Sequence, residues 1–226
     1  MPLRPALLAE IKQALGAALS PSLTAGSACS DLYEAYLFTL VLEAAKTEGA
    51  SVVLRSIDSH SPKPFVFRTS PGFIGSRTQN YGYAVIRFPD CPILEAHLGI
   101  RVSGHSGVLH ELDISVLLQD EATLCRSSAD RVAPRSHKVM IAIEAKYYTT
   151  DVALGLGRGF LGLTRDLSAH NAFFAINRTA PSAERLLTHK GQKWEHRVIP
   201  TDPVAVERLR NAFQKAFRNF VTTYGP

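Results

Sequence analysis

The sequence predicts an α/β fold in which a mixed central sheet is flanked by helices. Segments 108–118 and 137–148 are dominated by β-branched and aliphatic residues and are separated by a turn-rich stretch, which is typical of two strands. The preceding stretch, 50–103, alternates further strand-like segments with turns. After residue 148, helix-like and strand-like segments alternate, which indicates a helix crossing between neighbouring strands.

Length and composition predict one ordinary globular domain. The 226 residues suffice for a single sizeable core, and we expect one domain over 1–226. A net charge of +5 favours a polyanionic partner without requiring one. The three cysteines are far apart and lack zinc-site spacing, so we expect free thiols in a reducing cytoplasm. No apolar run reaches about eighteen residues, and we expect no membrane-spanning segment.

Two helices are expected before the first strand. Residues 3–20 place six apolar side chains on one helical stripe: Leu7, Leu8, Ile11, Leu15, Ala18 and Leu19. After a linker of small residues, a second helix is expected with Asp31 as N-cap and Gly49 as the stop. This helix is apolar nearly all round, which predicts that it is buried. Glu34 stands at capping-box spacing from Asp31 and would then bond a backbone N–H.

Four strand-like segments follow, at 51–57, 64–70, 81–88 and 92–102. The last leads through a glycine-containing turn into segment 108–118, which predicts an antiparallel hairpin and a core sheet that begins near Ile93. The glycine-rich segment 69–82 is expected to be a mobile loop that reaches toward a substrate. Three arginines lie in or near this segment: Arg68, Arg77 and Arg87. They are candidate phosphate contacts, although each one taken alone is more typical of a solvated charge.

Charged residues stand at corresponding places on the two central strands. In segment 108–118, alternation places four apolar side chains on one face: Leu112, Ile114, Val116 and Leu118. Asp113 lies on the opposite, polar face. In segment 137–148, Glu144 and Lys146 share one face at the end of an otherwise apolar run. If the strands pair, two carboxylates and a lysine converge. Such a set suits Mg²⁺ and an attacking water, with the lysine offsetting charge on a phosphoryl group.

Asp113 followed by Glu144-Ala145-Lys146 resembles the D…(D/E)xK signature of the PD-(D/E)XK, or restriction-endonuclease-like, nuclease superfamily. A lone ExK tripeptide is usually a solvated surface feature, but here it ends a strand that follows the aspartate strand and precedes a helix. Leu112 and Ile114 flank Asp113, so the proline of the superfamily name is absent, at a position that varies among members. The resemblance covers about residues 28–200, which leaves the N-terminal and C-terminal helices as additions to the core.

The resemblance implies a restriction-endonuclease-like core and a Mg²⁺-dependent deoxyribonuclease, with Mn²⁺ as a substitute, that leaves a 5′-phosphate. Asp113 and Glu144 would ligate the metal by side chain, Ala145 by its carbonyl oxygen, and Lys146 would position the water. Glu34 would point into the site from the first core helix and support the metal. The pathways left open are restriction or anti-phage defence, junction resolution and DNA repair. The rival from another class is a non-cutting subunit that binds nucleic acid or assembles a complex.

Residues 149–169 are expected to form the crossover helix. Gly157, Gly159 and Gly162 have GxGxxG spacing, but no glycine turn joins them directly to the preceding strand, so a dinucleotide site is not expected. We expect these glycines to allow close packing against the sheet. Arg158 and Arg165 are seven residues apart on one helical face, where they would either approach substrate phosphates or be solvated.

The remaining segments are expected as a strand at 171–179, a helix and turn at 181–193, a strand at 195–200 and a closing helix at 203–221. The closing helix has an apolar stripe, Val206, Leu209, Phe213, Phe217 and Phe220, and a basic face, Arg208, Arg210, Lys215 and Arg218. That basic face would be solvated or an approach to nucleic acid. A homodimer is expected if the enzyme breaks both DNA strands, with the first and last helices as candidate surfaces.

Overall fold

The computed structural model describes residues 3–16, 23–58, 64–78, 80–128, 130–168 and 171–225. It contains one seven-stranded mixed sheet whose strands lie in the order of the sequence. The strands are β1 (Ser51–Ser56), β2 (Gly82–Arg87), β3 (Leu94–Ser103), β4 (Leu109–Leu118), β5 (Val139–Lys146), β6 (Ala172–Ile176) and β7 (Lys193–Glu195). Neighbours from β1 to β5 are antiparallel, whereas β5, β6 and β7 are parallel. The predicted α/β class and mixed sheet are therefore confirmed, but the predicted start of the sheet near Ile93 was wrong, because β1 and β2 belong to the same sheet.

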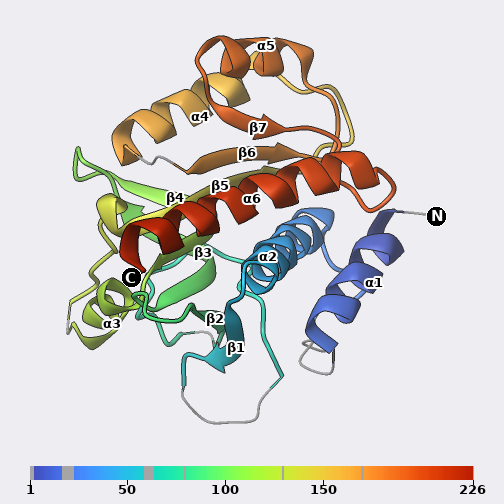
Figure 1. Ribbon diagram of the computed structural model, residues 1–226. Coiled ribbons are helices and arrows are strands. Elements are labelled where there is room, and N and C mark those ends of the chain that lie inside the picture. The colour runs from blue at the N-terminus through green and yellow to red at the C-terminus, as the bar shows by residue number, and fades with distance from the viewer. Residues whose placement is uncertain are drawn as a thin grey trace.

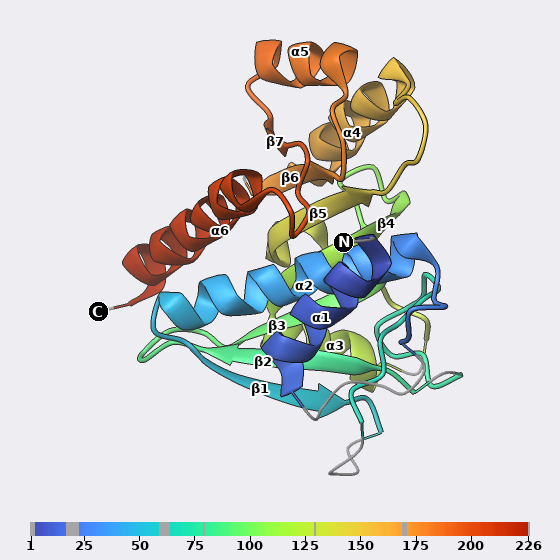
Figure 2. The same ribbon diagram turned by 90° about the vertical axis from the view of Figure 1, so that its right-hand side faces the viewer.

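Helices cover both faces of this sheet (Figures 1 and 2). They are α1 (Leu3–Leu15), α2 (Cys29–Thr47), α3 (Gln119–Ser127), α4 (Leu154–Leu167), α5 (Pro181–His189) and α6 (Pro203–Tyr224). Helices α2 and α6 lie side by side across one face, and α1 packs on the outside of α2. Helices α4 and α5 pack together over the β6–β7 side, and α3 lies against β3 and β4.

Strand β6 shows how two cores form from one run of apolar residues. Its five residues are all buried, and successive side chains point to opposite faces. Phe173 stacks edge-on with Phe213 of α6 at 5.0 Å between ring centroids. Phe174 meets Phe160 of α4 at 5.4 Å. The sheet is therefore buried on both sides here, as expected for parallel strands joined by a crossover helix.

The predicted helix boundaries were partly right. Helix α1 is confirmed, although Ala18 and Leu19 of its predicted stripe lie outside the described residues. Helix α2 is buried as predicted, and Gly49 follows its end with φ +92°, a conformation that favours glycine. The Asp31 cap was wrong, because the helix begins at Cys29 after Ala28 and has no side-chain cap. Asp31 instead stands in the first turn, where a negative charge suits the helix dipole.

Segment 64–70 was predicted as a strand and forms only an isolated bridge. Its apolar side chains serve the core without a ladder, since Phe65 and Phe67 pack against Phe38 of α2. Arg68 is also buried, only 8% exposed, with its guanidinium 3.9 Å from the centre of the Tyr81 ring. It is therefore neither a solvated charge nor an exposed phosphate contact.

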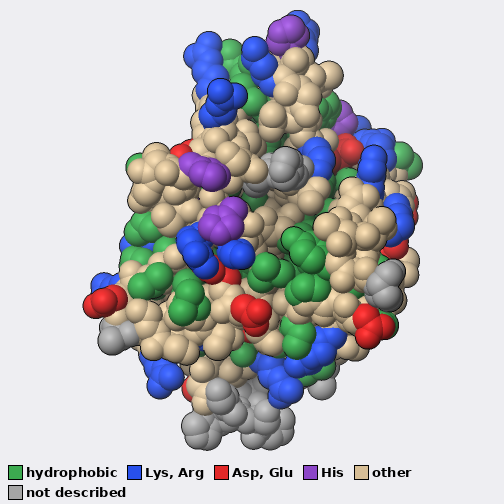
Figure 3. All heavy atoms as spheres, turned by 60° about the vertical axis from the view of Figure 1, so that its left-hand side comes forward, with side chains coloured by type: hydrophobic (Ala, Val, Ile, Leu, Met, Phe, Trp, Pro, Cys, Tyr) green, Lys and Arg blue, Asp and Glu red, His purple; other side chains and the backbone are tan. Residues whose placement is uncertain are grey.

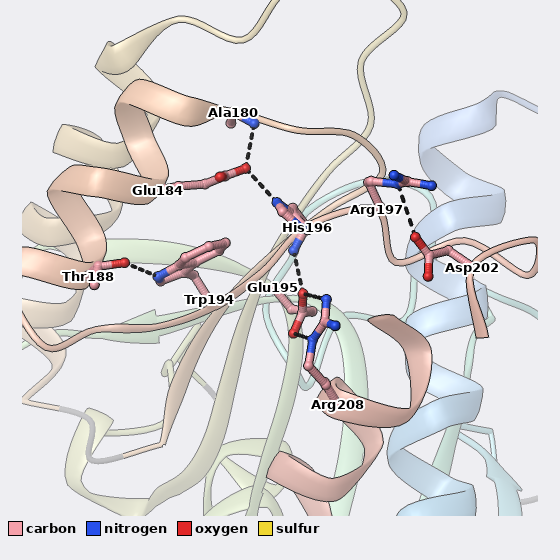
Figure 4. Close-up of polar contacts among 9 residues, drawn as sticks. All are labelled: Ala180, Glu184, Thr188, Trp194, Glu195, His196, Arg197, Asp202 and Arg208. Atoms are coloured by element: carbon pink, nitrogen blue, oxygen red, sulfur yellow. Dashed lines mark hydrogen bonds and ion pairs between the residues drawn. The ribbon is translucent and has the colours of Figure 1, made fainter. Parts of the chain in front are cut away.

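The predicted strand 195–200 was also wrong, because β7 spans Lys193–Glu195. Polar contacts with two helices end the strand (Figure 4). Glu184 of α5 accepts the backbone N–H of Ala180 at 2.7 Å and lies 2.7 Å from His196 Nδ1. Glu195 accepts two hydrogen bonds from Arg208 of α6, both at 2.8 Å. These contacts join the end of β7 to α5 and α6.

Helix α4 confirms the predicted crossover, but its glycines act differently from the prediction. A Cβ added at Gly157 would lie 3.1 Å from the Cβ of Ala183, so this glycine permits the close packing of α4 on α5. Added Cβ atoms at Gly159 and Gly162 would have no described neighbour within 4 Å. Close packing on the sheet was therefore the wrong explanation for the GxGxxG spacing.

Helix α6 buries its whole predicted apolar stripe. Its basic face is largely paired with acids, because Arg208 bonds Glu195 and Arg218 bonds Glu48, the residue that follows α2. Arg210 pairs with Glu43 and Glu207. The stripes of α1 and α6 are used inside the chain, which removes the reason for choosing these helices as a dimer surface. No helix among the described residues is both long and apolar enough to cross a membrane.

Candidate active site

The predicted catalytic residues meet where β4 and β5 diverge. The strands pair from Leu117–Val139 to Ile114–Ile143, and the register includes a bulge after Val116. Beyond Ile114, a side-chain hydrogen bond takes the place of the backbone hydrogen bonds between the two strands. The Oδ2 atom of Asp113 accepts the backbone N–H of Ala145 at 2.7 Å. The aspartate is thereby held in a fixed position at the mouth of the two strands.

Lys146 joins the two carboxylates. Its Nζ lies 2.6 Å from Glu144 Oε1 and 3.4 Å from Asp113 Oδ2. All three side chains are largely buried, with exposed fractions of 13% for Asp113, 20% for Glu144 and 24% for Lys146. The sequence placed these residues on two strands, and the structure brings them into one hydrogen-bonded cluster.

The charges of the cluster depend on one another. Burial and the neighbouring Asp113 raise the pKa of Glu144, although Lys146 opposes them. Burial alone would lower the pKa of Lys146, but Asp113 and Glu144 outweigh it and raise the pKa. Lys146 is therefore a cation at neutral pH. In this state it can orient a water or offset developing negative charge, whereas it cannot accept a proton.

Glu34 lies in the second turn of α2 and belongs to the same electrostatic environment. Burial, followed by the charges of Asp113 and Asp31, raises the pKa of Glu34 to about 8, with Lys146 acting in the opposite direction. Among the described residues, the carboxyl group of Glu34 makes no hydrogen bond or ion pair, although its backbone belongs to the helix. Because Asp31 is not the N-cap, the capping-box explanation is wrong. Glu34 is an acid placed near the cluster with no bonding role in the helix.

Glu111 is a fourth carboxylate at this site, and the sequence interpretation did not select it. It precedes Asp113 by two residues on the same face of β4, and burial and Asp113 both raise its pKa. Its cross-strand partner on β3 is Arg101. The alternation of β4 already indicated that Glu111 lies near Asp113. The pairing of Glu111 with Arg101 became visible only from the register between β3 and β4.

The other predicted site residues are less closely connected. Ala145 is buried, and its N–H is the group that Asp113 binds. Arg158 and Arg165 are exposed on α4, and no hydrogen bond or ion pair between described residues joins either to Asp113, Glu144 or Lys146. On the face shown in Figure 3, Lys and Arg side chains lie in several separate groups with acids between them. The basic charge is not gathered into one stripe there.

The cluster suits a hard cation that needs few protein ligands. Among the described residues, no group of three or more His, Cys, Asp and Glu side chains could hold a metal ion together. Mg²⁺ commonly uses one or two carboxylates and fills its remaining positions with waters and substrate phosphates. Asp113 and Glu144 provide such a pair, and Asp113 Oδ1 accepts no hydrogen bond from the described residues.

Replacing Glu34 with glutamine is expected to stabilise the metal-free protein at pH 8. The folded-state pKa of Glu34, about 8, is above its ordinary value of 4.5, so ionisation opposes folding as the pH rises between these values. Glutamine preserves the shape and cannot ionise. In EDTA, the difference in melting temperature between Glu34→Gln and the wild type should therefore become more positive as the pH rises from 5 to 8. The matched variant Glu207→Gln, on the exposed side of α6, should show no such trend. A pH-independent difference for Glu34→Gln would contradict the assignment.

Comparisons with protein-family models, with curated proteins and with solved structures find no match.

Proposed function

We propose that the protein is a Mg²⁺-dependent deoxyribonuclease with a restriction-endonuclease-like core. The observation that carries this proposal is the contact of Lys146 with both Asp113 and Glu144 at the point where β4 and β5 separate. The order of elements supports it: a buried helix α2, the antiparallel strands β3, β4 and β5, the crossover helix α4, and β6 parallel to β5. The ExK ends the strand after the aspartate strand, as the resemblance requires.

In the proposed reaction, water attacks a DNA phosphorus atom, the bond to the 3′-oxygen breaks, and that oxygen leaves with a proton as a hydroxyl. The products are a 5′-phosphate and a 3′-hydroxyl. The ammonium of Lys146 orients the water and offsets the charge that develops on the phosphoryl oxygens. The Ala145 N–H holds Asp113 Oδ2, which directs the aspartate toward the same space.

Asp113, Glu144 and the Ala145 carbonyl would hold the Mg²⁺, and Glu34 would bind waters of its outer shell. A bound Mg²⁺ would supply Lewis acidity and lower the pKa of a coordinated water. Because each chain would have one such site, cutting both strands requires two copies or two visits. A two-fold homodimer is part of this proposal for an enzyme that makes double-strand breaks.

Metal removal is expected to abolish cleavage. Supercoiled plasmid and labelled single-stranded and duplex DNA would be incubated with the purified protein in Mg²⁺, Mn²⁺, Ca²⁺ or EDTA. We expect cutting with Mg²⁺ or Mn²⁺, little with Ca²⁺ because it accepts looser geometry, and none in EDTA. Full activity in EDTA would exclude this mechanism. No cleavage of any DNA under the metal conditions, with DNA binding retained, would favour the non-cutting subunit.

A further inference from the structure

A polar cavity of about 390 Å³ is lined by the loop 71–78, by Arg101 of strand β3, and by residues at and beyond the end of α3, namely 125, 128 and 130–132. We call it the Arg101 cavity. Two arginines, Arg101 and Arg131, contribute to its wall. Three hydroxyl side chains join them: Ser76, Thr78 and Ser128. The cavity therefore combines cationic groups with hydrogen-bond donors.

Strand register places this cavity next to the candidate active site. Arg101 of β3 is the direct cross-strand partner of Glu111 of β4, so the two side chains share one face of the sheet. Asp113 lies two residues from Glu111 along β4. Diagonal neighbours of this kind are about 7–8 Å apart on paired strands. A DNA strand bound at Asp113 would therefore pass close to Arg101.

The arginines of the cavity are available to a ligand. Both are exposed, and neither makes an ion pair with a carboxylate among the described residues. The Arg101 guanidinium lies 5.4 Å from the centre of the Phe73 ring, which limits its freedom without using its hydrogen-bond donors. One carboxylate, Asp130, also lines the cavity and reduces its positive charge. By contrast, three arginines of α6 already have acidic partners.

We propose that the Arg101 cavity binds a backbone phosphate of the DNA strand whose neighbouring phosphodiester lies at Asp113. This inference rests on the proposed function and identifies its substrate contacts. Guanidinium groups bind phosphate oxygens through paired hydrogen bonds, and serine and threonine hydroxyls add further donors. Arg101 and Arg131 thus take the role that the sequence interpretation gave to Arg158 and Arg165.

DNA binding would be measured separately from cleavage. Arg101→Gln, Arg131→Gln and the double variant would be made in a Glu144→Gln background, with Arg185→Gln of α5 as the matched exposed control. Anisotropy of labelled single-stranded and duplex oligonucleotides would be followed against KCl concentration in EDTA. We expect each cavity substitution to weaken binding for all sequences and to reduce the salt slope by about one, while Arg185→Gln leaves both unchanged.

The outcomes separate this inference from the proposed function. Unchanged slopes in the cavity variants would overturn the inference, even if the wild type cuts DNA. Equal effects in Arg185→Gln would also overturn it, because the contribution would then be general surface charge. Reduced slopes confined to the cavity variants would support it, even if the wild type fails to cut in Mg²⁺, and only hydrolysis would then be rejected. Circular dichroism melts would verify that each variant is folded.

Discussion

Asp113→Asn, Glu144→Gln and Lys146→Ala are each expected to reduce DNA cleavage at least about a hundredfold, because each removes a charge that the proposed transition state needs. Asparagine and glutamine are the sharpest replacements for the acids. Asp113→Asn retains an oxygen that can accept the Ala145 N–H, whereas Asp113→Ala would leave this buried donor without its partner. Cleavage would be measured as initial rates on plasmid DNA at saturating Mg²⁺.

The effects on stability should differ in sign within this set. Removing either acid reduces repulsion among Asp113, Glu144 and Glu34, so the metal-free variants should melt at or above the wild-type temperature. Removing Lys146 takes away the cation that the acids surround, and this variant should melt lower. Lys138→Ala is the control and should retain activity, because Lys138 comes just before the first residue of β5, at the end of the strand away from Lys146. Near-normal cutting by any of the three site variants would refute the assignment.

The central part of the fold could be predicted because its local patterns and its tertiary structure agree. The apolar run of β5 already places Glu144 and Lys146 on one face, and alternation places Asp113 opposite Ile114 and Val116. Their convergence required only that the two strands pair. Leu112 was wrongly assigned to the face of Ile114, because it packs in the separate core that contains Ile100 and Val102. Strand β6 was also predictable, since residues 172–176 form a short run of five apolar residues, which is typical of a strand covered on both faces.

Long-range contacts explain what the sequence did not reveal. Helix α3 was not predicted because it is short and polar, and it is held to the sheet by Arg126, whose partner Glu95 is 31 residues away. The cavity beside Arg101 likewise depends on a register and on a loop that meet only in the folded chain. Arg158 and Arg165 share a helical face as predicted. The way α4 packs in the folded chain leaves both side chains exposed, which the sequence alone did not reveal.

Glu95 of β3 is a fully buried carboxylate. Removing its cationic partner is expected to cause the largest loss of stability among the predictions made for this protein. The Glu95 side chain accepts hydrogen bonds from Arg126, Gln119 and His97. Burial would raise the pKa of Glu95, but the hydrogen bonds from His97 and Arg126 prevail and lower it to about 2. Burial lowers the pKa of His97, so Arg126 is the permanent cation of this network.

Arg126→Met is expected to destabilise the protein by about 3–5 kcal/mol at pH 7, because it leaves the Glu95 carboxylate buried without its cation. The wild-type contribution is present above the ordinary carboxyl pKa of 4.5 and is lost as the pH falls toward 2. The deficit of the variant should therefore shrink between pH 5 and pH 3, as measured by urea unfolding. Arg218→Met is the matched control, since its arginine is 54% exposed and the pair should contribute at most about 1 kcal/mol.

The double variant Glu95→Gln with Arg126→Met tests the physical cause. It removes the buried charge together with its partner, so part of the lost stability should return. Because the end of α3 and the segment after it line the Arg101 cavity, Arg126→Met should also weaken DNA binding through that cavity, and the double variant should restore binding in proportion to stability. An equal, pH-independent loss in Arg126→Met and Arg218→Met would show that packing, not the buried charge, holds α3 on the sheet.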